Sequence, residues 1–127
     1  MTPVISKNAP AAVGPYSHAV IHNDTVYCAG QIPLNPATGE IVGTTIEDQT
    51  RQVMSNLEAV LKDCHTSLNN IVKTTVFLAS MDDFAGMNQV YEAALGGHKP
   101  ARSAFQVARL PKDALVEIEC IAVCDKK

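Results

Sequence analysis

The sequence predicts a single α+β domain spanning residues 1–127, in which one β-sheet carries two helices on one face. Its length suits one hydrophobic core. Two stretches repeat apolar residues at helical spacing, and β-branched or alternating runs lie before, between and after them. Because two helices can cover only one face of such a sheet, the other face needs a different cover.

Composition excludes several classes of protein. The chain is 46% hydrophobic and 18% charged, which is typical of a globular domain. Its net charge is −3, and its lysines and arginines are scattered, so nucleic acid is disfavoured as a partner. The four cysteines form no CxxC pair and lie in apolar runs, which favours reduced core thiols over metal ligands.

The chain has no apolar run of the length that a membrane span needs, about 20 residues. Residues 1–12 contain one lysine, no arginine and no long apolar run, unlike a signal peptide. A mitochondrial presequence would need arginines on an amphipathic helix. We therefore expect a cytoplasmic protein rather than a mitochondrial or membrane one.

In the first half of the chain, residues 17–21 and 25–29 predict two short strands around a turn at His22, Asn23 and Asp24. A loop rich in turn-forming residues follows at 33–39. Thr44-x-x-Glu47 has the pattern of a capping box. The helix predicted after it, over 46–64, is defined by an apolar stripe of Ile46, Val53, Leu57, Val60, Leu61 and Cys64.

In the second half, the β-branched run 71–79 predicts a central strand, and Ser80-x-x-Asp83 resembles a second helix cap. The next helix is predicted from a stripe of Phe84, Met87, Tyr91, Ala94 and Leu95, and Gly96-Gly97 ends it. Residues 102–109 and 115–123 predict the closing strands. The expected order is therefore ββ-α-β-α-ββ.

The last predicted strand indicates what the second face of the sheet requires. Its even positions form an unbroken apolar row that suits the helices: Val116, Ile118, Cys120 and Ala122. Its odd positions are apolar at both ends and acidic at Glu117 and Glu119. Apolar residues at both ends of this row are not expected on a face exposed to solvent. We therefore expect a second copy of the chain to cover this face of the sheet.

Candidate catalytic groups are few. The sequence has no glycine-rich phosphate loop, no HExxH and no GxSxG motif, and its four histidines lack ligand spacing and are expected at the surface or in turns. Arg102 opens a predicted strand and offers a planar donor fork for a carboxylate. Glu117 and Glu119 share one face among apolar residues, which raises carboxyl pKa values and suits acid/base chemistry. An Arg–Glu pair that only stabilises a subunit interface fits the same residues.

Eight segments together resemble one known family, the RidA/YjgF reactive-intermediate deaminases. Pro100-Ala101-Arg102-Ser103 is the most distinctive of them. The others, in chain order, are residues 8–11, 14–16, 30–33, 71–77, 88–91, 107–111 and 116–122. The resemblance runs almost from end to end, and so many segments in one order are more specific than any single motif.

The resemblance implies a chorismate-mutase-like fold of the Bacillus type with one mixed sheet. It also implies a homotrimer with its sheets packed at the centre and its active sites between subunits. The implied reaction is the hydrolytic deamination of 2-iminobutanoate, 2-iminopropanoate or their enamine tautomers to 2-oxo acids and ammonia. No metal and no organic cofactor are implied, and the ligands are short imino and 2-oxo acids.

The resemblance also implies residue roles. Arg102 would bind the substrate carboxylate, and Glu117 would polarise the attacking water or shuttle the proton. The pocket would be lined by Tyr16, Gly30 and Asn88, with backbone groups near Gly30 and Ala104 completing it.

Two departures from the family pattern leave other functions open. Ala104 stands where many relatives have cysteine, and Ala29 where many have serine, so no cysteine nucleophile is available there. The loop at 96–99 is also shorter than in many relatives. One alternative is therefore a regulatory module that binds a 2-oxo acid without turnover. Ribonuclease or translation-inhibitor activity and chaperone-like holding are further alternatives.

Overall fold

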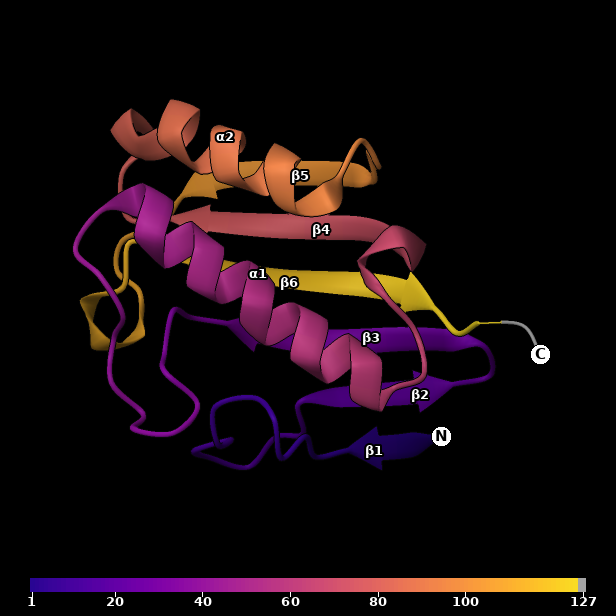
Figure 1. Ribbon diagram of the computed structural model, residues 1–127. Coiled ribbons are helices and arrows are strands. Elements are labelled where there is room, and N and C mark those ends of the chain that lie inside the picture. The colour runs from indigo at the N-terminus through magenta and orange to yellow at the C-terminus, as the bar shows by residue number, and fades with distance from the viewer. Residues whose placement is uncertain (126–127) are drawn as a thin grey trace.

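The computed structural model describes residues 1–125 and contains one six-stranded sheet with two helices on one face (Figure 1). The strands are ordered β1-β2-β3-β6-β4-β5, and the sheet is mixed because β4 and β5 are parallel. In chain order the elements are β1 (Thr2–Val4), β2 (Ala19–His22), β3 (Thr25–Gln31), α1 (Ile46–Asp63), β4 (Ile71–Leu78), α2 (Phe84–Leu95), β5 (Ala101–Gln106) and β6 (Val116–Val123). This arrangement confirms the predicted α+β domain with two helices on one mixed sheet.

The edge strand β1 was not expected from the sequence. It pairs antiparallel with β2, with Thr2 opposite Ile21 and Val4 opposite Ala19. Three residues are too few to produce a clear alternation, and Pro3 confines the strand to a sheet edge. The observed order is therefore the predicted one preceded by one more strand.

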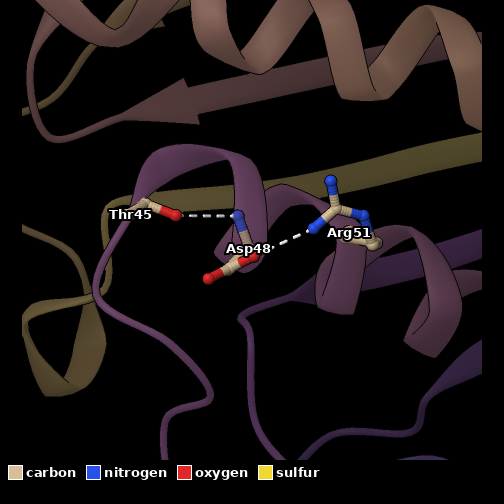
Figure 2. A network of polar contacts seen from close by, with 3 residues as sticks. All are labelled: Thr45, Asp48 and Arg51. Carbon is tan, nitrogen blue, oxygen red and sulfur yellow. Dashed lines mark hydrogen bonds and ion pairs between the residues drawn. The ribbon is translucent and has the colours of Figure 1, made fainter.

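The N-terminus of α1 lies where the sequence predicts it, but its cap is different. The N-cap residue is Thr45, whose hydroxyl accepts a hydrogen bond from the Asp48 backbone N–H at 3.1 Å, and Asp48 in turn pairs with Arg51 at 2.9 Å (Figure 2). The expected capping box at Thr44 and Glu47 was wrong by one residue. Since Glu47 and Asp48 both fall in the first turn, they interact favourably with the helix dipole in this register.

The elements after α1 agree with the prediction except at their ends. Ser80 caps a short 3-10 turn, Met81–Asp83, rather than α2 itself, which begins at Phe84. Gly96 ends α2 in the left-handed conformation, with φ of 58°, as expected for a glycine there. Strand β5 ends at Gln106, earlier than the predicted 109.

The two faces of the sheet differ as the alternation in β6 predicts. The even positions Val116, Ile118, Cys120 and Ala122 are buried against the helices in the main core. On the other face of the same strand, Ile121 and Val123 are 37% and 41% exposed. No element among residues 1–125 covers this open face (Figure 1).

All four cysteines are free thiols. Cys28 lies opposite Cys120 on neighbouring strands, and the hydrogen bond between them, together with burial, raises the pKa of Cys28 far above its ordinary value. Burial likewise raises the pKa of Cys64 to about 12. Along the described part of the chain, neither helix is both long and apolar enough to cross a membrane.

Candidate active site

Glu117 lies half-buried on the open face of the sheet, directly beside Gly30. The pairing of β3 with β6 shifts register between Cys28 and Gln31, and this irregularity turns Gly30 toward the carboxylate. A Cβ atom on Gly30 would lie 2.1 Å from Glu117 Oε2. Only glycine therefore leaves the carboxylate room in this position.

A hollow of about 630 Å³ surrounds the Glu117 carboxylate. Its walls come from three segments: the stretch before β2, the end of β3 with the loop that follows it, and the turn before β6. The lining residues are Pro10, Ala11, Val13, Tyr16, Ala29, Gly30, Gln31, Ile32, Leu34, Gly39, Pro111, Lys112 and Glu117. The hollow, which we call the Glu117 hollow, thus contains the predicted Tyr16, Gly30 and Glu117 together.

The surroundings of Glu117 raise its pKa above the ordinary value for a glutamate. Burial is the larger cause, and the negative charge of Glu119, two residues along the same face, is the second. A carboxylate with a raised pKa is a stronger base when it is ionised. This arrangement suits Glu117 to taking a proton from water.

Arg102 is held in place from α2. Its Nη1 donates a hydrogen bond to Asn88 Oδ1 at 2.7 Å. Its guanidinium carbon lies 5.4 Å from the centre of the Phe84 ring and 5.1 Å from that of Tyr91. Cation–π contacts of this kind fix the plane of the guanidinium, so its remaining donors point in a defined direction.

Tyr91 is itself anchored in the core. Its hydroxyl shares a hydrogen bond of 2.7 Å with the buried Thr74 of β4, and burial raises the pKa of the phenol. A second hollow, of about 470 Å³, opens at this place between α2 and the start of β5. It is lined by Asn88, Tyr91, Glu92, Leu95, His98, Lys99, Pro100 and Arg102.

Within one chain, Arg102 and Glu117 are directed to opposite faces of the sheet. Arg102 lies beside Thr74, whose side chain reaches Tyr91 on the helix face. Glu117 lies beside Phe77, three residues further along β4 and therefore on the other face. The structure thus groups Tyr16 and Gly30 with Glu117, and Asn88 with Arg102, in two separate hollows.

Ala104 follows Arg102 on the same side of β5 and packs, partly buried, against the core. Ala29 lies in the wall of the Glu117 hollow. Neither position offers a hydroxyl or thiol to a ligand, as the sequence indicates. Chemistry in these hollows therefore depends on the other side chains that line them and on backbone groups.

The expectation that the histidines lie at the surface or in turns was wrong for His18. This side chain is 1% exposed, whereas His22 and His65 are exposed and His98 is partly buried. Sequence reasoning also gave no role to Phe84 beyond the apolar stripe. Across residues 1–125, no cluster of three or more histidine, cysteine or acidic side chains could hold a metal ion.

Comparison with known proteins gives consistent matches over nearly the whole chain. A family model described as Endoribonuclease L-PSP matches residues 6–124. A RutC family protein of Pyrococcus horikoshii is 52% identical over 119 residues, which are 94% of each chain. The 2-iminobutanoate/2-iminopropanoate deaminase of Mus musculus is 45% identical over 120 residues, covering 94% of this chain and 89% of its own. The crystal structure of E. coli TdcF with bound serine has a TM-score of 0.93 at 41% identity, covering 98% of this chain and 100% of its own.

Proposed function

Because the chain belongs to the endoribonuclease L-PSP family, also known as RidA/YjgF, we propose that it is a 2-iminobutanoate/2-iminopropanoate deaminase. It would hydrolyse short imino acids, or their enamine tautomers, to 2-oxo acids and ammonia. The mouse relative carries this activity in its name. TdcF, which binds serine in its crystal structure, supports a small ligand with both a carboxylate and a nitrogen.

The observation that carries the proposal is that Arg102 and Glu117 offer complementary chemistry, one for binding a carboxylate and one for proton transfer. Arg102 presents a guanidinium whose plane is fixed by Phe84 and Tyr91, which suits two-point binding of a carboxylate. Glu117 presents a half-buried carboxylate with a raised pKa, which suits proton transfer to and from water. Hydrolysis of an imino acid needs both groups, the guanidinium at the substrate carboxylate and the proton-transferring carboxylate at the imine.

The separation of these groups in one chain supports an active site built from two copies. Since Arg102 and Glu117 face opposite sides of their own sheet, one copy's Arg102 would meet the neighbouring copy's Glu117. The apolar open face gives the copies a surface on which to associate. We propose a homotrimer with a chorismate-mutase-like fold and three such sites.

The chemistry requires only anchoring, water and proton transfer. Arg102 holds the carboxylate while water adds to the imine carbon, and Glu117 takes a proton from that water. Glu117 passes that proton to the imine nitrogen, which gives a neutral carbinolamine. It then takes the proton of the carbinolamine hydroxyl as the C=O bond forms and delivers it to the nitrogen, so the C–N bond breaks and ammonia leaves. Tyr16 and the backbone at Gly30 line the place where the reacting carbon would sit, and Asn88 keeps Arg102 oriented.

A coupled assay tests the proposal. Threonine dehydratase generates 2-aminocrotonate and 2-iminobutanoate from threonine, and the appearance of 2-oxobutyrate is followed with and without this protein. We expect the protein to accelerate that appearance, and the matched variant Glu117→Gln to lose the acceleration. If the wild-type protein has no effect on the rate, the deaminase proposal fails.

The second candidate is a regulatory module that binds 2-oxo acids without turnover. It is favoured by Ala29 and Ala104, which supply no hydroxyl or thiol to the site. In that case 2-oxobutyrate would bind, as measured by calorimetry, while the coupled assay shows no acceleration. Ribonuclease activity is less well supported, because the net charge is −3.

A further inference from the structure

His18 uses both nitrogens of its buried ring to hold the segment that precedes β2. Its Nδ1 lies 2.8 Å from the backbone nitrogen of Ser6, and its Nε2 lies 2.6 Å from the carbonyl oxygen of Pro10. With the side chain 1% exposed, water does not compete for either contact. The ring therefore ties two points of this segment, four residues apart, to the start of the sheet.

The two partners determine the protonation state of the ring. The Ser6 N–H can only donate, so Nδ1 must present its lone pair, and the Pro10 carbonyl can only accept, so Nε2 must carry the hydrogen. The side chain is thus a neutral imidazole with one acceptor and one donor. A glutamine side chain also offers a hydrogen-bond acceptor and a donor, whereas a leucine side chain of similar bulk offers neither.

The segment that His18 holds is a wall of the Glu117 hollow. Pro10 and Tyr16 line the hollow from this side. The backbone oxygen of His18 also accepts a hydrogen bond of 2.9 Å from the N–H of Ala29, and Ala29 and Gly30 line the same hollow. One residue therefore connects two of the segments that line the hollow around the Glu117 carboxylate.

A second anchor fixes the far end of the same segment. The Ser6 hydroxyl donates a hydrogen bond to Asp63 at the end of α1, and the Asn8 backbone N–H donates to the Ser6 oxygen at 3.1 Å. Ser6 is thus held both by α1 and by the His18 ring. Loss of the ring contacts would leave Pro10 and the chain up to Tyr16 without this buried attachment.

We propose that His18 is a positioning residue of the active site, which holds the wall carrying Pro10 and Tyr16 at a fixed distance from Glu117. This proposal rests on the proposed function in that the wall encloses the imino acid. His18 touches no substrate itself. It acts by preventing the wall from moving, since a displacement of about 1 Å at a reacting centre can reduce a rate about 100-fold.

The test compares His18→Leu with His18→Gln, and uses His22→Leu, a change at the exposed last residue of β2, as the control. All three are checked for fold by circular dichroism. We expect His18→Leu to lower kcat about 10- to 100-fold in the coupled assay. His18→Gln should recover most of that loss, and His22→Leu should match the wild type.

Amide hydrogen exchange gives a readout that does not depend on turnover. The Ser6 amide, which donates to the buried ring, should be protected in the wild type and in His18→Gln, and should exchange faster in His18→Leu. A ring ¹⁵N spectrum of the wild type should identify the neutral Nε2–H tautomer. If the protein proves to have no deaminase activity, these two measurements still test the role of His18.

Three results would overturn the proposal. The first is a His18→Leu variant with unchanged kcat and unchanged protection of the Ser6 amide. The second is an equal loss in His18→Leu and His18→Gln with the fold intact, since hydrogen bonding would then not be the cause. The third, which needs no variant, is a wild-type His18 ring in a different tautomer or doubly protonated.

Discussion

The guanidinium of Arg102 is oriented by three side chains of α2, namely Phe84, Asn88 and Tyr91. Glu117 is held differently: backbone geometry at Gly30 makes room for its carboxylate, and burial shifts its pKa upward. The two residues therefore differ in what they contribute. In the proposed reaction, Arg102 supplies a fixed direction for binding the carboxylate, and Glu117 supplies an exchangeable proton.

A comparison of Arg102→Lys with Glu117→Gln separates these two contributions. Lysine keeps the charge but loses the planar fork and its stacking. A charge-assisted pair contributes roughly 1.5–3 kcal/mol, so kcat/KM should fall about 10- to 150-fold. Glutamine cannot accept the proton, so kcat should fall about 10²- to 10⁴-fold, while 2-oxobutyrate still binds. Steady-state kinetics and calorimetry measure both quantities.

Both variants are to be compared at equal oligomeric state and with circular dichroism spectra like the wild type. Near-normal rates in both would mean that Arg102 and Glu117 have structural roles only. Binding of a 2-oxo acid without turnover would then be better supported than deaminase activity.

A substitution at Glu119 tests the assignment of Glu117 as the base through the pH dependence of kcat/KM. The negative charge of Glu119 is the second cause, after burial, of the raised pKa of Glu117. Removing that charge in Glu119→Gln should lower the pKa of Glu117 part of the way toward the ordinary value. Because the base must be ionised to take a proton, the acid limb of the kcat/KM profile should move to lower pH. A profile measured from pH 4 to 8 that does not move, or moves upward, would contradict this assignment of Glu117 as the base.

At the scale of elements, pairing register determines what the site contains. Strand β4 lies between β5 and β6, with Thr74 beside Arg102 and Phe77 beside Glu117. A shift of one residue in either pairing would exchange the faces on which these side chains lie. The register shift in β3 likewise brings Gly30 against Glu117. The helices contribute by orienting Arg102 and by covering one face.

The N-terminus of α1 allows stability to be changed without touching either hollow. In Thr45→Ala the Asp48 N–H loses its cap, so the free energy of unfolding should fall by about 0.5–2 kcal/mol. Thr45→Ser keeps the hydroxyl and should lie near the wild type. Denaturant titration measures the change, and the deaminase rate of folded protein should be unaffected. An unchanged stability in Thr45→Ala would mean that Thr45 does not act as the cap.

At the scale of the whole molecule, the open face of the sheet is the dominant feature. Large apolar side chains are 37–47% exposed on β3, β5 and β6, at Tyr27, Phe105, Ile121 and Val123. They belong to a surface that also carries Glu117 and Glu119. Contiguous apolar surface of this kind is typical of an interface between copies. The same association would bring together the two hollows that one chain keeps apart.

Light scattering at micromolar concentration tests this association. We expect a mass of about three times the 13.6 kDa of one chain. Ile121→Lys would place a charge in the apolar surface, so it should lower the mass and the deaminase rate together. Glu58→Lys, on the exposed side of α1, is the control and should change neither. A monomeric wild-type protein that is fully active would contradict the shared site.

The sequence by itself determined the features that depend on neighbouring residues. Helical spacing located α1 and α2 to within one or two residues, Gly96 fixed the end of α2, and alternation in β6 distinguished the two faces of the sheet. Arg102 and Glu117 stood out because charged groups are unusual in such strands. The resemblance to one family added their roles and named Tyr16, Gly30 and Asn88.

Only the tertiary structure decided which distant segments meet. It paired β1 with β2, placed β6 between β3 and β4, directed Arg102 and Glu117 to opposite faces, and buried His18 against Ser6 and Pro10. The physical reason is that periodicity reports the local conformation of a segment. Strand pairing and the burial of a polar side chain instead depend on partners many residues away, which no local pattern specifies.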